Sequence, residues 1–334
     1  MPKLKFFLSF IVFFISLFPF SFSYATKVID KIPNNILIYH RFNDSRFPST
    51  NTTIDQFESH IQYLISKNYK FITLTELINN PSYEKKTIAI TVDDAYQSFY
   101  DYAYPILKKN NISATLFLST STVGSSEHLN WEQLKDLQSY GIDIQNHTHT
   151  HPHLPDLSIE KIEEEIIISQ KIISDNLGFT PHLFAYPYGE ASEDAILVIK
   201  KYFKAAFGQH SGAFSLNDPY YIARFPINEN FGSIERIKNA SSVLSFKNTG
   251  IEPSNQKLNV ISNQKRYVVN FFEDPSNVTC YISDFNGSIK SQQNIMNTVI
   301  LIELERPPVK GRLRFNCTKF EEGTYWYGYQ YYVN

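Results

Sequence analysis

The sequence predicts an α/β fold: a distorted (β/α) barrel of about seven parallel strands over residues 26–245, then a small all-β, sandwich-like domain over residues 251–334. Short apolar runs alternate with helix-like segments in the first region. After about residue 257 only β-type runs separated by turn residues remain. The 334 residues, 43% of them hydrophobic, are enough to bury one large core and one small one.

Seven apolar runs predict the barrel strands. They are ILIY (36–39), KFITL (70–74), TIAITV (87–92), SATLFLS (113–119), GIDIQN (141–146), HLFAY (182–186) and KAAFG (204–208). Strands that alternate with helices indicate parallel β–α–β units. About seven such units in about 200 residues suit a closed or nearly closed barrel better than two small sheets.

Five segments between these strands have apolar residues at helical spacing or helix-end signals. They are residues 53–68, 95–110, 131–141, 158–178 and 192–203. Ser158 is a plausible N-cap of the longest helix, and Gly141 and Gly178 are C-terminal stop signals. The segment around residues 241–256 is predicted to be a linker.

Six β-type runs predict the C-terminal domain. They are KLNVIS (257–262), RYVVNFF (266–272), VTCYISDF (278–285), NTVILIEL (297–304), GRLRFNCTKF (311–320) and TYWYGYQYYV (324–333). The chain's two cysteines, Cys280 and Cys317, lie in two of these runs. In an exported chain this single pairing favours a disulfide, and two buried free thiols are the alternative.

The first 25 residues have the pattern of a secretory signal peptide. Lys3 and Lys5 precede an apolar run from Phe6 to about Phe20, and small residues lead up to a cleavage site after Ala25. An uncleaved membrane anchor is the alternative. No second apolar run approaches the roughly 20 residues of a membrane span. We therefore expect an exported protein, periplasmic, cell-envelope or secreted, that meets the membrane only through its leader.

The overall charge argues against one class of partner. The formal net charge is −2, so the chain lacks the basic footprint of a nucleic-acid binder. The sequence makes no prediction of oligomeric state.

Histidines and aspartates follow the predicted strands at the points where the strands end. His40 follows ILIY, Asp93 and Asp94 follow TIAITV, and a histidine-rich stretch follows GIDIQN. In a (β/α) barrel the carboxyl ends of the strands form one face, so we expect these side chains to converge there. Adjacent carboxylates repel, and a divalent cation offsets that repulsion. Alternatively, one of the two aspartates caps the helix that begins at Ala95.

Four histidines fall within the stretch QNHTHTHPHL, residues 145–154. If THTH forms one helical turn, His147 and His151 lie on the same face and can bind one ion. His149 is then expected to point elsewhere, and His153, after Pro152, to leave the site. The alternative is a solvated histidine-rich loop.

Together these motifs resemble the polysaccharide deacetylase family (carbohydrate esterase family 4, NodB homology domain). TVDDA (91–95), HTHTH (147–151) and AYPYG (185–189) are similar to its T-F-D-D-G, H-[ST]-x-x-H and R-x-P-Y-G motifs, in the family's order. ILIYH (36–40) corresponds to the strand that carries the family's last catalytic histidine. Its early position resembles a circularly permuted branch. The resemblance covers about residues 30–230.

The resemblance implies a metal centre. Asp94, His147 and His151 would hold a divalent ion, usually Zn²⁺ in this family, with Co²⁺ or Ni²⁺ as alternatives. Asp93 would be the general base that activates water, and His40 would protonate the leaving amine.

The resemblance also implies an oxyanion site formed by Pro187 and Tyr188, through the backbone N–H near Tyr188. His210, which also follows a strand, competes with His40 for the acid role, and we favour His40.

Two positions depart from the family pattern. Ala95 stands in place of the usual Gly, and Ala185 in place of the Arg that orients the catalytic Asp. Arg224, in ARFPIN, either supplies a replacement guanidinium next to the substrate site or forms a surface ion pair.

The expected function is removal of N-acetyl groups from an N-acetylated polysaccharide of the cell envelope or an exported polysaccharide. A carbohydrate-binding protein with impaired catalysis, or an O-acetyl esterase that uses the same site, is the alternative.

Overall fold

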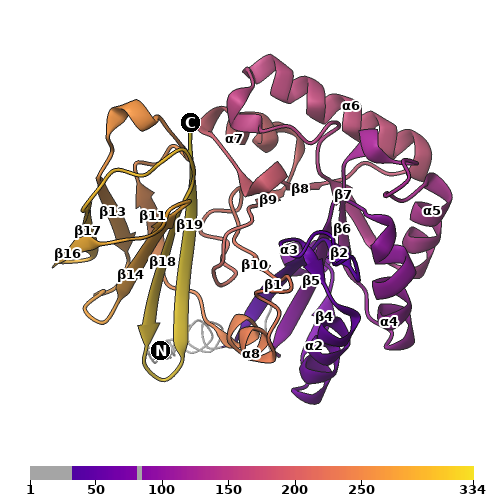
Figure 1. Ribbon diagram of the computed structural model, residues 1–334, viewed down its shortest axis with the longest axis horizontal. Helices are drawn as coiled ribbons and strands as arrows, with labels where there is room; N and C mark the ends of the chain where they lie inside the picture. Colours follow the sequence, from indigo (N-terminus) through magenta and orange to yellow (C-terminus); the bar gives the residue numbers. More distant parts are fainter. Residues whose placement is uncertain (1–31, 81–84) are drawn as a thin grey trace, which may run out of the picture.

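Figure 1 shows the computed structural model, which describes residues 32–80 and 85–334. A parallel-sheet barrel, coloured indigo through pink to orange, lies beside a β-sandwich coloured orange to yellow. The predicted leader lies outside the described residues. No described helix combines the length and the hydrophobicity that a membrane span requires.

A curved parallel sheet forms the barrel, as predicted. Within the described residues, seven strands follow the order β10-β1-β5-β6-β7-β8-β9, and β4 pairs with β5 beside them. The strands are β1 (Asn34–Tyr39), β4 (Lys70–Ile72), β5 (Thr87–Asp93), β6 (Thr115–Leu118), β7 (Asp143–Asn146), β8 (Leu183–Ala185), β9 (Ala205–Phe207) and β10 (Phe225–Pro226). A parallel bridge between Phe207 and Ile222 brings β9 close to the chain that enters β10, so the sheet nearly closes.

Helices cover the outside of this sheet, and hydrogen-bonding side chains fix their ends. Thr53, Asn130, Ser158 and Ser192 each accept a backbone N–H in the first turn of the following helix. The predicted stops at 141 and 178 are left-handed glycines, as such helix ends require. The helices are α2 (Ile54–Ser66), α3 (Leu74–Asn79), α4 (Tyr104–Lys109), α5 (Trp131–Tyr140), α6 (Ile159–Leu177), α7 (Glu193–Tyr202) and α8 (Ile234–Ser242).

Several short elements depart from the sequence prediction. The run 70–74 is a strand only to Ile72, because the Thr73 side chain caps α3. The predicted helix 95–110 begins as a π-helical turn, Phe99–Ala103, before α4. The predicted linker contains the end of α8 and the whole of a strand, residues 248–252, that pairs into the sandwich. A small parallel pair, β2 (Arg41–Phe42) and β3 (Asn51–Thr52), follows β1.

The C-terminal part is a two-sheet sandwich, as predicted. Its sheets have the orders β11-β13-β17-β16 and β12-β19-β18-β14-β15. The strands are β11 (Asn248–Glu252), β12 (Lys257–Leu258), β13 (Arg266–Phe271), β14 (Thr279–Asp284), β15 (Gly287–Ile289), β16 (Ser291–Met296), β17 (Val299–Leu304), β18 (Gly311–Phe320) and β19 (Thr324–Val333). Cys280 and Cys317 are directly opposite on β14 and β18 and form the predicted disulfide.

The barrel and the sandwich share hydrophobic core. One buried cluster runs from Ile166 of α6 and Ile199 of α7 to Val269 and Phe315 of the sandwich. The backbones also meet directly: a Cβ added to Gly328 of β19 would lie 1.6 Å from the Ser211 carbonyl oxygen, so no side chain fits there. The sandwich is therefore packed against the barrel as part of the same folded body.

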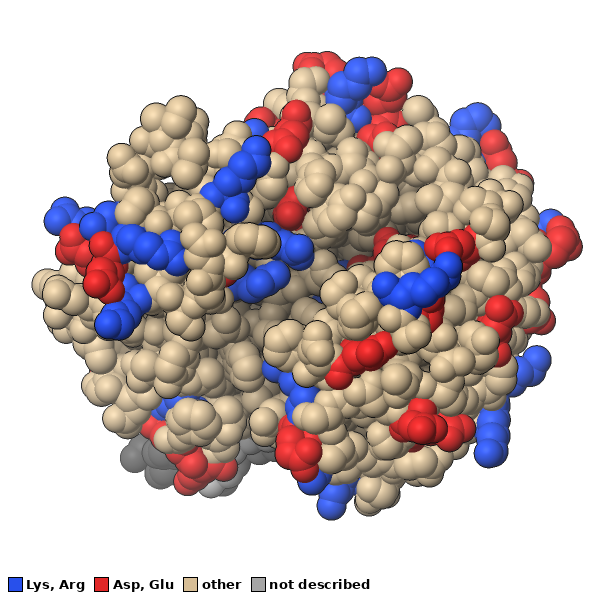
Figure 2. Space-filling model, in the orientation of Figure 1, with Lys and Arg blue, Asp and Glu red and all other residues tan. Residues whose placement is uncertain are grey.

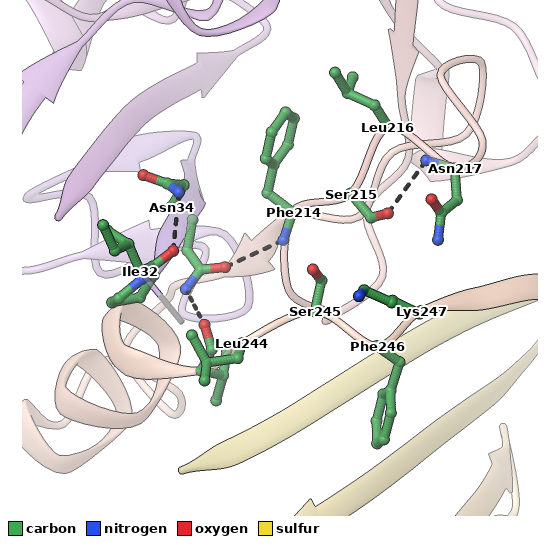
Figure 3. A pocket seen from close by; sticks show the side chains of 13 residues that line it. Ile32, Asn34, Phe214, Ser215, Leu216, Asn217, Leu244, Ser245, Phe246 and Lys247 are labelled. Carbon is green, nitrogen blue, oxygen red and sulfur yellow. Dashed lines mark hydrogen bonds between the residues drawn. The ribbon is translucent and has the colours of Figure 1, made fainter. Parts of the chain in front are cut away.

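A cavity of about 190 Å³ marks this junction near the start of β1 (Figure 3). Beside it, the buried Asn35 side chain accepts the Phe214 N–H at 3.1 Å and donates to the Val243 carbonyl oxygen at 2.9 Å. These bonds tie three distant segments together. The cavity lies at the opposite end of β1 from His40, so it is part of the joint between the two domains.

Candidate active site

A second cavity, of about 400 Å³, opens at the carboxyl ends of the barrel strands. His40 enters it after β1, Asp93 and Asp94 at the end of β5, His147 and His151 after β7, and Tyr188 after β8. The convergence expected at this edge of the sheet is therefore present.

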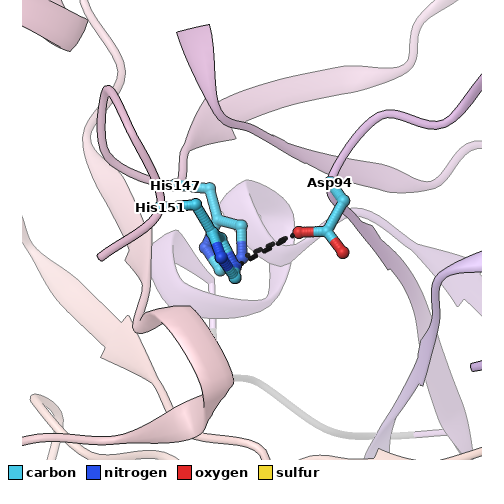
Figure 4. A group of neighbouring side chains, drawn as sticks. All are labelled: Asp94, His147 and His151. Atoms are coloured by element: carbon cyan, nitrogen blue, oxygen red, sulfur yellow. Dashed lines mark ion pairs between the residues drawn. The ribbon is translucent and has the colours of Figure 1, made fainter. Parts of the chain in front are cut away.

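Asp94, His147 and His151 face one another across this cavity (Figure 4). Asp94 Oδ1 lies 3.4 Å from Nε2 of His147 and 3.4 Å from Nε2 of His151. A tetrahedral ion with nitrogen and oxygen ligands at about 2.0–2.2 Å spaces its ligands about 3.4 Å apart. The three side chains thus have the chemistry and spacing of a divalent metal site.

Hydrogen bonding and burial prepare the two imidazoles for this role. His147 Nδ1 donates to the Ala185 carbonyl oxygen at 2.8 Å, so Nε2 is the ring nitrogen that faces Asp94. Burial lowers the pKa of His151 to about 4, so that ring is neutral at pH 7.

The charges around Asp94 favour a cation. Burial opposes ionisation of Asp94, but the hydrogen bond from His147 and the neighbouring imidazoles hold its pKa well below the usual range. Burial likewise lowers the pKa of His147, but the hydrogen bond to Asp94 and the charges of Asp93 and Asp94 outweigh it and raise that pKa. The cluster therefore attracts positive charge.

The loop that joins the two histidines is not helical, so the predicted helical turn is wrong. Thr148 and His151 have φ values of 70° and 59°, in the left-handed region. Glu165 of α6 accepts the backbone N–H groups of His149 and Thr150 at 2.9 and 2.7 Å. These bonds replace those of a helical turn and hold the loop against α6.

The other two histidines of the stretch differ in placement. His149 is turned away, with Nδ1 2.8 Å from Thr120 Oγ1. His153, as expected, is not among the residues that line the active-site cavity, although it stays next to Tyr188. Its ring stacks on Tyr188 with centroids 4.1 Å apart, and its Nδ1 lies 2.6 Å from Glu190 Oε2. These two contacts place His153 beside the 187–190 segment.

Asp93 is held by Arg224. The guanidinium binds both carboxylate oxygens at 2.8 Å, and its Nε donates to the Gly208 carbonyl oxygen at 2.8 Å. Arg224 is 0% exposed, so its interpretation as a surface ion pair is wrong. Burial would raise the pKa of Asp93, but Arg224, with His147 and His40, lowers it. A guanidinium therefore contacts Asp93 although position 185 is an alanine.

His40 and His210 lie in different cavities. His40 lines the cavity of the metal-site residues, and its Nε2 is 3.0 Å from the Gln209 side-chain nitrogen. Burial lowers the pKa of His40 against the opposing charges of Asp94 and Asp93. His210 lines a separate cavity between barrel and sandwich, where burial lowers its pKa to about 3.

The 187–189 segment forms the remaining wall. Pro187 is buried, while the Tyr188 ring lies 4.5 Å, centroid to centroid, from that of His151. Tyr188 has φ 59°, and Asp94 and Ala95 have φ 73° and 55°. Left-handed conformations of non-glycine residues cost energy and cluster at functional sites. Ala95 stands where such a φ favours glycine.

Other residues that line the cavity were not predicted, among them Tyr96, His128, Gln209 and Arg312. Gln209 follows β9 almost directly, so the strand-end argument could have found it. Arg312 comes from β18 of the sandwich, and no barrel motif could have indicated it.

The family model described as "Polysaccharide deacetylase" matches residues 80–204. The "Putative polysaccharide deacetylase YxkH" of Bacillus subtilis (strain 168) is 30% identical over 175 residues, which span 51% of this chain and 61% of that protein. The "Poly-beta-1,6-N-acetyl-D-glucosamine N-deacetylase" of Staphylococcus aureus (strain MRSA252) is 32% identical over 214 residues, 58% of this chain and 74% of that protein.

Solved structures show the same barrel fold. The Streptococcus pyogenes deacetylase PplD in complex with acetate has a TM-score of 0.58 and 24% identity, and the match covers 63% of this chain and 99% of that one. IcaB from Ammonifex degensii has a TM-score of 0.56 and 21% identity, covering 64% and 98%. At these identities the likeness is one of fold, and about a third of this chain lies outside each match.

Proposed function

This chain belongs to the polysaccharide deacetylase family, and on that premise we propose that it hydrolyses N-acetyl groups of an exported, N-acetylated polysaccharide. One observation carries the proposal: the Asp94, His147 and His151 cluster lies beside an aspartate that a buried arginine holds in place. The name of the staphylococcal relative supports a polymer of N-acetylglucosamine as the substrate class.

The donor set fits a divalent cation, with two imidazole nitrogens and one carboxylate oxygen. Such an ion supplies a Lewis acid that polarises the amide carbonyl and makes a water molecule more acidic. His147 contributes Nε2 because its Nδ1 is committed to the Ala185 carbonyl oxygen. Zn²⁺ is the expected ion, and Co²⁺ and Ni²⁺ suit the same ligands.

Asp93 is proposed as the general base. Its low pKa keeps it ionised at neutral pH, so it can accept a proton from water. Arg224 occupies one lone pair of each carboxylate oxygen, and a second lone pair on each remains for that proton. The guanidinium also fixes the direction of the carboxylate.

His40 is proposed as the acid that protonates the leaving amine, which an amide needs because an unprotonated amine leaves poorly. Gln209 holds the imidazole through Nε2. The backbone N–H near Tyr188, beside Pro187, is proposed to stabilise the oxyanion of the tetrahedral intermediate.

Export remains part of the proposal. The Cys280–Cys317 disulfide supports an oxidising compartment outside the cytoplasm. Cell fractionation with an antibody to the native chain checks it, and recovery of the protein only from the cytoplasm in the thiol form would contradict it.

The test is acetate release from N-acetylglucosamine oligomers with β-1,6 or β-1,4 links and from peptidoglycan, with metal content measured on the same sample. Asp94→Ala and His147→Ala should lose both bound metal and acetate release. His182→Ala, which replaces a histidine that bonds to Thr75 away from the cavity, is the matched control. If Asp94→Ala and His147→Ala kept both metal and activity, the proposed mechanism would be wrong.

A further inference from the structure

The sandwich contributes a basic residue to the active-site cavity. Arg312 of β18 lines the cavity that holds Asp94 and His151. Its Nη1 lies 3.5 Å from the Tyr188 carbonyl oxygen, and its Nε lies 3.9 Å from Glu190 Oε1. The side chain is 38% exposed, so the guanidinium is anchored on the barrel and still reaches solvent.

A further cavity of about 460 Å³ begins at the same arginine. Its lining includes His153, Glu190, Phe285, Lys310, Arg312 and Tyr332, and we call it the sandwich groove. Arg312 lines both cavities, so the sandwich groove continues the active-site cavity onto the C-terminal domain. Figure 2 shows Lys and Arg side chains along the seam between the sandwich and the barrel.

Phe285 gives the sandwich groove an apolar platform. Its side chain is 87% exposed on the turn between β14 and β15. The turn is rigid, because the fully buried Asp284 carboxylate accepts two bonds from Arg306 and the backbone N–H groups of Asn286 and Val309. Because this ring lies in a groove with charged donors, it can pack against the apolar face of a sugar ring.

The wall between the two cavities is also aromatic. The His153 ring stacks on Tyr188 at 4.1 Å and lies 6.2 Å from the ring of Tyr332. Glu190, 4% exposed, holds His153 through Nδ1. Aromatic faces with neighbouring charged donors suit the apolar ring faces and the hydroxyl groups of a sugar.

We propose that the sandwich completes the active site: the sandwich groove binds a sugar residue adjacent to the one that is deacetylated, with Phe285 under its ring face and Arg312 at the junction. This inference rests on the proposed function. The groove carries Lys310, Arg312 and Arg314 against Asp156 and Glu190, so it should prefer a neutral acetylated sugar to a cationic deacetylated one.

The kinetic test uses β-1,6-linked N-acetylglucosamine oligomers from disaccharide to hexasaccharide. The wild-type kcat/KM should rise with oligomer length as the groove becomes occupied. Phe285→Ala and Arg312→Ala should each flatten that rise, with a loss of about tenfold on the hexasaccharide. Phe320→Ala and Arg266→Ala remove exposed residues elsewhere on the sandwich and should keep the wild-type dependence. Unchanged length dependence in Phe285→Ala and Arg312→Ala would overturn the inference.

A binding measurement separates this inference from the proposed function. Calorimetric titration of the acetylated and the fully deacetylated hexasaccharide into Asp94→Ala protein measures binding to the groove without turnover. The acetylated form should bind more tightly, and adding Phe285→Ala should weaken it. If the wild type released no acetate from any glycan, the proposed function would fail. Weaker binding by Phe285→Ala would still support sugar binding in the sandwich groove. Equal affinity with and without Phe285→Ala, or no binding at all, would overturn the inference that the sandwich groove binds a sugar residue.

Discussion

Arg224 and Asp93 form the most deeply buried ion pair at the site, with side chains 0% and 3% exposed. Removing the guanidinium leaves a buried carboxylate without its partner. We therefore expect Arg224→Met to lower the free energy of unfolding by about 3–5 kcal/mol and to abolish acetate release.

Arg224→Lys should rescue little, because an ammonium group cannot bind both oxygens in parallel. Urea denaturation gives the comparison, with Arg266→Met, exposed on β13, as the control. Wild-type stability in Arg224→Met would contradict this account of the pair.

His40 should matter more for amides than for esters. An amine leaves only when protonated, whereas an alkoxide leaves more easily without an acid. His40→Ala should therefore lower kcat on an N-acetylated substrate by about 10²–10⁴-fold and on an O-acetylated sugar by much less. Parallel acetate assays on the two substrates measure the ratio, and equal losses on both would remove His40 from the acid role.

At the residue scale, the sequence predicts the metal-site residues because their spacing and strand context are local. Arg224 could be proposed as a replacement arginine, but its burial follows from packing among β5, β9 and the chain before β10. The role of His153 depends on Glu190 and Tyr188, which no local pattern connects to it.

The loop between β7 and α6 depends on one helical side chain. Glu165 accepts the N–H groups of His149 and Thr150, and its other oxygen accepts the Thr150 hydroxyl at 2.7 Å. Glu165→Ala should free the loop and weaken metal affinity by about 10–100-fold, as removal of supporting bonds around metal ligands does.

Competition with a fluorescent chelator measures that affinity. Glu164→Ala, on the same helix, replaces an exposed glutamate that pairs only with Lys161 among the described contacts and should bind metal like the wild type. Equal metal affinities of Glu165→Ala and Glu164→Ala would show that the 147–151 loop keeps its conformation without Glu165.

The β14–β15 turn should have a pH-dependent stability. The hydrogen bonds from Arg306 hold the pKa of Asp284 below its usual range, against the opposing effect of burial. The contribution of Asp284 is therefore fully present above its unfolded pKa of about 4 and is lost as pH falls through the lower folded value.

Asp284→Asn should cost about 1–3 kcal/mol at pH 7, and its difference from the wild type should shrink below about pH 4. Denaturation across that pH range measures the difference, with the exposed Glu273→Gln as control. A difference that stayed constant at all pH values would argue against this ion pair.

Among the elements, long helices and apolar strands follow from periodicity and end signals, as α5 and α6 do. Two-residue strands such as β2, β3 and β10 carry too few residues for a period to be visible. The 147–151 loop escapes prediction because Glu165, fifteen residues away, supplies its hydrogen bonds.

The shared core predicts that the two domains unfold together. A chain that ends after Ser245 would expose the barrel side of the cluster around Ile166 and Ile199. We expect this truncated chain to aggregate or to lack a cooperative transition, while the full chain shows one transition. Gel filtration and calorimetry check both. A monomeric truncation with the wild-type Tm would show that the barrel is independent.

At the scale of the whole molecule, the α/β class and the all-β C-terminus follow from the change in pattern along the chain. How the two parts join does not, because Arg312, Gly328 and the shared cluster depend on contacts between distant segments. The predicted domain bounds and circular permutation stay predictions.

Gly328 gives this joint an unusual experimental use. With a bare backbone pressed against the Ser211 carbonyl oxygen, a single methyl group at 328 would act as a wedge between barrel and sandwich. Gly328→Ala would change no catalytic side chain and no side chain of the sandwich groove. It would only increase the separation between the barrel surface and the sandwich surface that carry them. The activity of Gly328→Ala on long polymers, measured against that of the wild type as temperature rises, would then show how much polymer recognition depends on the relative position of barrel and sandwich.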